Sequence, residues 1–317
     1  MENTKKKTEL LWVLLAVLAV YIIVLVLEMV MPGTHILFTV LKKGAIYALV
    51  AVSMNLLNGF TGLFSLGQAG FMLIGAYVYA IFTMPVSVKA GESVYKYYDC
   101  ALSFDTGLLV GLICAGLAAA LFAALIGLPV LRLKSDYLAI ATLGFAEIIR
   151  AIFQWDTLGP VTNGANVMRQ YLDLTQIKIP FTDIPFPPTT FVMLVAGICI
   201  ALILLLINSS YGRAFKAIRD DEVAAEAMGI SLFKHKEMSF IISSFFAGIS
   251  GALLAMFQYT VQASQFKSAL TYEILLIVVI GGIGSVSGSV FASFLYVACS
   301  EWWLRFLDDP KYNILGM

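Results

Sequence analysis

Long apolar segments constrain the fold of this chain more than any other feature. A helix needs about 20 mostly apolar residues to cross a bilayer, because each residue adds about 1.5 Å along its axis. On this criterion the sequence predicts spans near residues 10–31, 36–58, 63–84, 107–131, 136–155, 190–208, 238–260, 270–284 and 288–306. We therefore expect an all-α fold, a polytopic membrane bundle of about nine helices within one transmembrane domain over residues 1–317.

The composition supports lipid as the main solvent. Hydrophobic residues make up 60% of the chain, charged residues only 13%, and the mean hydropathy is +0.91, whereas soluble domains carry about 25% charged residues. The formal net charge is zero, so no basic surface is expected for nucleic acid. His35 and His235 are far apart in the sequence and no cysteine pair has metal-ligand spacing. We expect neither an enzyme site nor a metal or cofactor site.

The distribution of basic residues predicts the orientation in a bacterial or archaeal cell membrane. Lys5, Lys6 and Lys7 precede the first apolar run, which is too long for a cleaved signal peptide. If these lysines lie in the cytoplasm, the loop 209–237 with its five basic residues is cytoplasmic too. The segment 157–189 is then external and holds only Arg169 and Lys178, in agreement with the positive-inside rule.

The loop 209–237 is longer than a connection between spans requires. It has nearly thirty residues, whereas helix–helix connections usually have about two to eight. Asp220 or Asp221 can cap the start of a short helix, and Gly229 is placed to end it. The loop is either a solvated amphipathic connection or a docking helix for a cytosolic partner, and we favour docking. The chain has no nucleotide-binding motif, so ATP would have to be bound by a partner.

Three groups of residues within the spans are candidates for a transport pathway. Small residues around Gly67 and Gly70 allow close helix packing, either for stability alone or in walls that slide. Gly282 and Gly284 lie in a glycine-rich hairpin between two predicted spans. Glu147, about 16 Å from the inner end of its helix, can pair with Arg150. That carboxylate either fixes the rotation of its helix or faces a watery pathway and meets an ammonium group.

Four segments in this order resemble the permeases of ATP-binding-cassette importers for branched-chain amino acids, of the LivM type. The segments are Asn58–Tyr77, Thr142–Arg150 with Thr162–Gly164, Gly212–Ile230 and Gly281–Gly288. The resemblance covers residues from about 55 to 305, including Glu301 and Arg305.

The resemblance implies an importer permease fold with about ten spans and several partners. These are a second, usually different, permease, two cytosolic ATPase subunits, and an extracytoplasmic protein that delivers leucine, isoleucine or valine. The resemblance also implies which residues contact the ATPase: Arg213, Lys216, Arg219, Asp220, Asp221, Glu222, Glu226 and Gly229. The family usually has one more span where this chain ends at Met317. Either the sequence is truncated or this member is short, and we favour truncation with a missing tenth span.

Other functions remain open at this stage. Within the same superfamily the cargo could be urea, short amides, sugars or nucleosides. A stand-alone secondary transporter, with Glu147 and Arg150 as an ion site, is opposed by the long inner loop and by the absence of a second half that repeats the first. A membrane enzyme would need a nucleophile–base pair or metal ligands, and the sequence offers neither.

Overall fold

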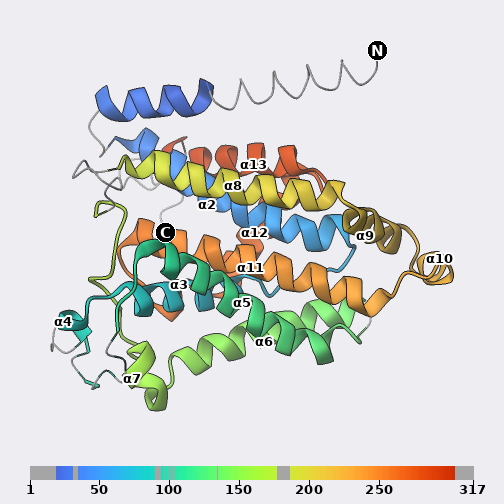
Figure 1. The fold of residues 1–317 in the computed structure, drawn as a ribbon, viewed down its shortest axis with the longest axis horizontal. Coiled ribbons are helices and arrows are strands. Elements are labelled where there is room, and N and C mark those ends of the chain that lie inside the picture. Colours follow the sequence, from blue (N-terminus) through green and yellow to red (C-terminus); the bar gives the residue numbers. More distant parts are fainter. Residues whose placement is uncertain are drawn as a thin grey trace, which may run out of the picture.

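The computed structural model describes residues 19–30, 35–89, 94–95, 97–98, 100, 102, 104–133, 135–176 and 186–303. These residues form an all-α bundle without a β-sheet, apart from a single antiparallel bridge between Met168 and Val261. Its long helices run along a common axis (Figure 1). They are a first helix at Ala19–Val30 followed by α2 (Ile36–Asn55), α3 (Gln68–Thr83), α5 (Leu108–Val130), α6 (Ser135–Phe153), α8 (Pro188–Asn208), α11 (Leu232–Gln258), α12 (Ser268–Gly281) and α13 (Val286–Ala298).

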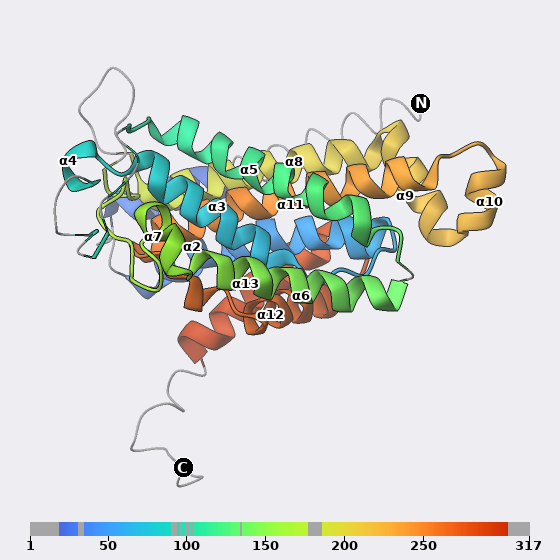
Figure 2. The same ribbon diagram turned by 90° about the horizontal axis from the view of Figure 1, so that it is seen from below.

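Short helices occupy the two ends of the bundle. One end carries α4 (Val86–Lys89) and α7 (Gly159–Thr162). At the other end, α9 (Ser210–Asp220) and α10 (Glu222–Ala227) extend beyond the long helices in both views (Figures 1 and 2). We call this the α9–α10 end.

Four helices in the described chain are long and apolar enough to cross a membrane by themselves. These four are Ile36–Phe60, Leu108–Val130, Pro188–Asn208 and Leu232–Gln258. A bent pair of helices, Tyr137–Phe153 and Asp156–Thr162, raises the number of candidate spans to five if the pair is counted as one span. Three further apolar helices, among them α3 and α12, are shorter. The helical membrane fold is therefore confirmed, whereas the count of nine or ten spans stays a prediction. The start of the first predicted span and the end of the last lie outside the described residues.

The outer helices turn apolar side chains away from the protein. On α5 these residues recur at every fourth position and are all exposed: Leu109, Ile113, Leu117, Leu121 and Leu125. Residues four apart share one face of a helix, so α5 presents a continuous hydrocarbon stripe. Such a surface is stable against lipid tails and not against water.

Helices α3 and α11 pack closely in the interior because glycines face each other there. A Cβ on Gly75 would lie 2.0 Å from the carbonyl oxygen of Gly248, and one on Gly251 would lie 2.0 Å from that of Met72. Neither space can hold a methyl group. The two backbones therefore touch directly, as small residues permit in membrane helices.

The third predicted span, 63–84, begins later than the sequence analysis places it. The helix α3 starts at Gln68, and residues 61–67 form an irregular, largely buried segment. Side chains replace the missing helical hydrogen bonds. The Asn58 carboxamide oxygen accepts from Ser65 N at 3.1 Å, and Thr142 Oγ1 accepts from Leu66 N at 3.0 Å. Irregular backbone can exist at membrane depth when protein groups satisfy it in this way.

Lys89, which the sequence places in an outer loop, is 3% exposed. Its ammonium group donates to the backbone oxygen of Phe104 and lies over the Phe104 ring. Burial lowers the pKa of Lys89. This lysine therefore contributes little exposed positive charge at that end.

Candidate functional site

The predicted docking helix corresponds to α10, and a second helix, α9, precedes it. α9 ends at Asp220, and Asp221 turns the backbone into the extended region with φ −158° and ψ 111°. The Asp221 carboxylate then accepts hydrogen bonds from Val223 N at 2.9 Å and Ala224 N at 3.1 Å. An aspartate that accepts from the second and third helical amides is a favourable N-cap. Of the two predicted capping residues, Asp221 is the one that caps.

Gly229 ends α10 as predicted. It adopts φ +83°, and its amide donates to the Glu226 oxygen at 2.9 Å while the amide of Ile230 donates to the Ala225 oxygen at 3.1 Å. This pair of bonds is a Schellman motif, in which a left-handed residue satisfies the last carbonyls of a helix. The six residues of α10 are thus closed at both ends by residues from the Gly212–Ile230 segment.

A hydrogen bond and an ion pair help to hold these helices against the bundle. The Arg219 guanidinium donates to the Gly59 carbonyl oxygen at 3.1 Å, and Lys236 at the start of α11 pairs with Glu222 at 2.7 Å. Gly59 belongs to a π-helical turn, Leu56–Phe60, that leads from α2 into the irregular segment before α3. The Arg219 contact therefore joins α9 directly to the backbone between two membrane helices.

The outer face of α10 exposes apolar side chains to water. Val223 is 78% exposed, and Met228, the residue that follows α10, is 83% exposed. The carboxylate of Glu226 is exposed as well. Only Ala225 of α10 is buried. Because burying such side chains is worth about 1.5–3 kcal/mol each, this face is suited to contact with another protein.

Among the remaining residues predicted to contact an ATPase, some side chains are exposed and one points toward the bundle. Arg213 is exposed and donates to Ser210 Oγ at 3.0 Å, and Asp220 is exposed and pairs with Arg219 at 2.8 Å. Lys216 is half-buried, and its amino group lies 5.7 Å from the centroid of the Phe60 ring. It faces the bundle rather than the exposed side of α10.

Glu147 and Arg150 form the predicted ion pair, with 2.7 Å between Glu147 Oε2 and both Arg150 Nε and Nη2. The other carboxylate oxygen accepts from Ser268 N at 3.1 Å, at the first residue of α12. A carboxylate at a helix N-terminus is favoured by the helix dipole. Both side chains stay partly exposed, at 36% for Glu147 and 24% for Arg150. The pair therefore joins α6 to α12 and also borders the surface.

Gly67 and Gly70 lie where α3 begins beside α6. A Cβ on Gly70 would approach the Cα of Ala146 to 2.9 Å, and one on Gly67 would lie 3.3 Å from the Thr142 oxygen. Both glycines thus allow contact between α3 and the helix that carries Glu147. Their place in a transport pathway stays a prediction.

Gly282 and Gly284 form the turn between α12 and α13, with φ +92° and +85°. The buried Asn55 side chain holds this turn. It accepts from Gly284 N at 2.7 Å and donates to Ser285 O at 3.0 Å and Ser289 Oγ at 2.8 Å. The turn lies beside Gly59 and the Arg219 guanidinium, so these glycines stand next to the α9 contact. Whether they also line a pathway stays a prediction.

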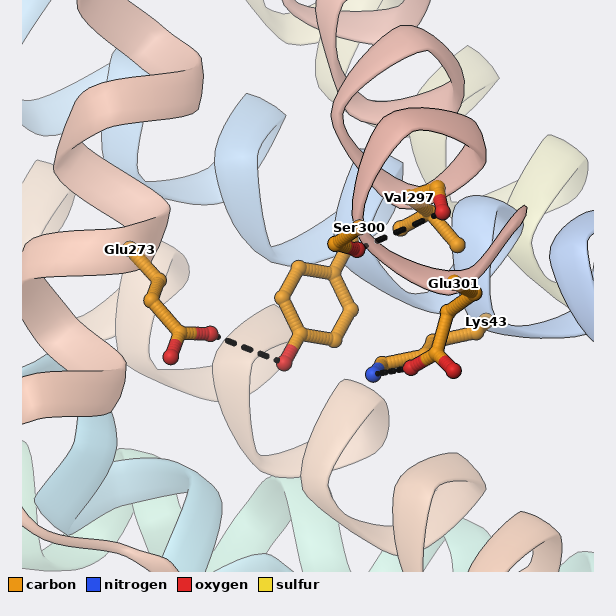
Figure 3. Close-up of polar contacts among 6 residues, drawn as sticks. Lys43, Glu273, Val297, Ser300 and Glu301 are labelled. Atoms are coloured by element: carbon orange, nitrogen blue, oxygen red, sulfur yellow. Dashed lines mark hydrogen bonds and ion pairs between the residues drawn. The ribbon is translucent and has the colours of Figure 1, made fainter. Parts of the chain in front are cut away.

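A second charge cluster, which the site prediction lacks, joins α2 and α12 to the π-helical segment Cys299–Trp303 that follows α13. Figure 3 shows Lys43 and Glu301 pointing toward one another as an ion pair, with Glu273 in the same cluster. The Tyr47 hydroxyl donates to Glu273 Oε2 at 3.4 Å. The signal was present in the sequence, because Glu273 lies inside the predicted span 270–284, where a carboxylate is costly unless it is paired or hydrated.

The family model described as "Branched-chain amino acid transport system / permease component" matches residues 36–315. The chain belongs to this permease family. It is 34% identical over 293 residues to the high-affinity branched-chain amino acid transport system permease protein LivM of Escherichia coli (strain K12), covering 86% of this chain and 64% of that protein. The corresponding protein of Salmonella typhimurium is equally similar. The chain thus spans slightly less than two thirds of these two relatives.

Archaeal members of the permease family are similar over a larger share of their own length. The probable LivM protein of Methanocaldococcus jannaschii is 24% identical over 296 residues, which cover 85% of this chain and 80% of that protein. The probable LivH protein of the same organism is 25% identical over 269 residues, with 81% and 78% covered. No solved structure matches.

Proposed function

We propose that this permease-family chain is the membrane subunit of an ATP-driven importer that moves leucine, isoleucine and valine into the cytoplasm. Support for the cargo comes from the names of the similar LivM proteins, which specify branched-chain amino acid transport. Support for ATP as the energy source comes from α10. The observation that carries the proposal is the exposed apolar face of α10. Asp221 and Gly229 stabilise the two ends of this helix, and Arg219 in the preceding helix binds Gly59.

In this mechanism the ATPase acts on the membrane helices through α9. Binding of ATP by two cytosolic subunits moves the α9–α10 pair, and the Arg219–Gly59 contact passes the displacement to the π-helical turn after α2. The Asn55-bound turn between α12 and α13 moves with it, because that turn lies against Gly59. The helices then open the pathway alternately to each side, as in other transporters that use rigid-body motion.

The partners and the orientation belong to the same proposal. The α9–α10 end faces the cytoplasm together with the N-terminus, since basic residues concentrate in the loop 209–237. A second permease covers the side where Glu147 and Arg150 reach the surface, because partly exposed charges at that depth are costly against lipid. An external binding protein delivers the amino acid, and the chain itself binds no nucleotide.

Reconstitution tests the proposed function. The chain is placed in liposomes with the ATPase and permease proteins encoded beside it and with the delivery protein, and uptake of labelled leucine is measured. We expect uptake that requires ATP and is competed by isoleucine and valine. Competition by urea, an amide, ribose or a nucleoside instead would reassign the cargo. Uptake by the chain alone, driven by a proton gradient, would refute the ATP-driven mechanism.

A second experiment tests the docking face. Val223→Asp and Met228→Asp place charge on the exposed apolar surface of α10, and the matched control Val86→Asp makes the same change at the opposite end, where Val86 is 38% exposed. Each α10 variant is expected to lower copurification of the ATPase subunits about tenfold, which corresponds to about 1.4 kcal/mol. Unchanged copurification in both α10 variants would remove the docking role.

A further inference from the structure

A groove of about 730 Å³ opens on the side of the bundle between α8, α9 and α13. Its walls are apolar over most of their length and include Leu204 from α8 and Phe291 and Phe294 from α13. Phe60 and Lys216 lie at the α9–α10 end, near Asn208. The groove therefore combines a hydrocarbon wall with a polar, positively charged end.

Lys216 sets the charge of this groove. It is the one charged residue in the lining, which contains no carboxylate. Its amino group lies over the Phe60 ring, and none of the ion pairs within the described chain involves it. The end of the groove thus offers a positive charge without an acidic partner from the described residues.

The depth of the groove matches one leaflet of a bilayer. Asn208 and Ile200 on α8, like Val286 and Phe294 on α13, are eight positions apart, or about 12 Å at 1.5 Å per residue. Half of the hydrocarbon core is about 15 Å. A narrower cavity of about 140 Å³ continues past Ile200, Val290 and Phe294 toward Gly197 and Tyr21.

We propose that this groove binds an anionic phospholipid of the cytoplasmic leaflet, with an acyl chain along α8 and α13 and the phosphate at Lys216. A neutral apolar molecule would gain nothing from the lysine, and a soluble anion would gain nothing from the apolar wall. Basic pockets between membrane helices on the cytoplasmic side favour anionic headgroups. The leaflet assigned here rests on the proposed orientation, in which the α9–α10 end is cytoplasmic.

A lipid in this position touches the moving parts of the proposed mechanism. Phe60 belongs to the turn held by Arg219, Gly284 and Ser285 belong to the turn held by Asn55, and all three line the groove. The bound lipid would therefore stabilise one arrangement of these turns. It is a candidate regulator of coupling between the ATPase and the membrane helices.

Native mass spectrometry of the purified full-length chain tests the site without any transport assay, so its result is independent of the proposed function. Binding of dioleoyl phosphatidylglycerol is compared with binding of dioleoyl phosphatidylcholine. We expect tighter binding of phosphatidylglycerol, and we expect Lys216→Ala to weaken it about fivefold, the contribution of one lysine near an anionic surface. Lys216→Arg is expected to retain the binding of phosphatidylglycerol. Lys234→Ala, which changes an exposed lysine outside the groove, is expected to retain it too.

The apolar wall is tested with a matched pair on α8. Leu204→Trp fills the groove and is expected to weaken binding of both lipids, whereas Leu205→Trp, at a 68% exposed position outside the lining, is not. Circular dichroism identifies variants that fail to fold. Equal binding of the two lipids by the native chain, no effect of Lys216→Ala, or equal effects of the two tryptophans would each overturn the proposal.

Discussion

Gly229→Ala isolates the contribution of one backbone conformation to the docking helix. Gly229 has φ +83°, and a Cβ built on it meets nothing within 4 Å. The substitution therefore causes no clash, and its cost is the left-handed conformation itself, about 1–2 kcal/mol for an L-residue. α10 has six residues and buries only Ala225, and a helix this short is marginal without its end contacts.

The expected result is a local opening of α10 without global unfolding. A cost of about 1–2 kcal/mol raises the open population about 5- to 30-fold. Hydrogen exchange should accelerate by that factor at the amides of Met228, Gly229 and Ile230, which donate to the last carbonyls of α10. Exchange in α11 should stay unchanged.

Two controls make this prediction refutable. Gly144→Ala changes a helical glycine that also has open space around its Cβ position, and it should leave exchange in α10 unaffected. Gly229→Asn should be milder than Gly229→Ala, because asparagine tolerates the left-handed region better. Native exchange rates in Gly229→Ala would show that the Schellman motif does not stabilise α10.

Three further substitutions test the bundle itself. Gly75→Ala should greatly reduce the yield of folded protein, because its Cβ would lie 2.0 Å from the Gly248 oxygen, whereas Gly144→Ala should not; equal yields on size-exclusion chromatography would contradict the close packing of α3 and α11. Glu147→Ala should lower thermal stability more than the double variant with Arg150→Ala, because the single change leaves an unpaired charge in the membrane; the reverse order would contradict the role of the pair. Asn55→Ala should lower the free energy of unfolding by about 1–3 kcal/mol, because buried partners such as Gly284 N lose their hydrogen bond. Its melting temperature should therefore be lower than that of Asn208→Ala, a change at an exposed site.

Much of the candidate site could be predicted from local patterns. An acidic cap and a glycine stop indicated a helix before Gly229, and the spacing of three residues indicated the Glu147–Arg150 pair; both are confirmed. Such features depend on residues within one or two turns, so the sequence contains the whole interaction. The cap at Asp221 is one of the two predicted, whereas the separate helix α9 before it was not predicted.

The contacts between distant segments could not be predicted in this way. Glu273 lay unassigned inside a predicted span, since its partner Tyr47 is 226 residues away. Lys216 was grouped with the docking residues by resemblance, because it lies in the Gly212–Ile230 segment, yet it turns toward Phe60 and the groove. The direction of a side chain on an amphipathic helix depends on how the helix packs, which no local pattern specifies.

Three properties can be derived from the amino-acid sequence alone: the chain is helical, lipid is its main solvent, and particular short segments carry capping and turn residues. These properties follow from hydropathy and from backbone preferences of single residues, both of which act locally. The packed structure is needed to show that α3 begins at Gln68, that Asn55 holds the α12–α13 turn, and that Arg219 reaches Gly59. Each of these depends on which buried polar groups meet across the bundle, and that is settled when the helices pack.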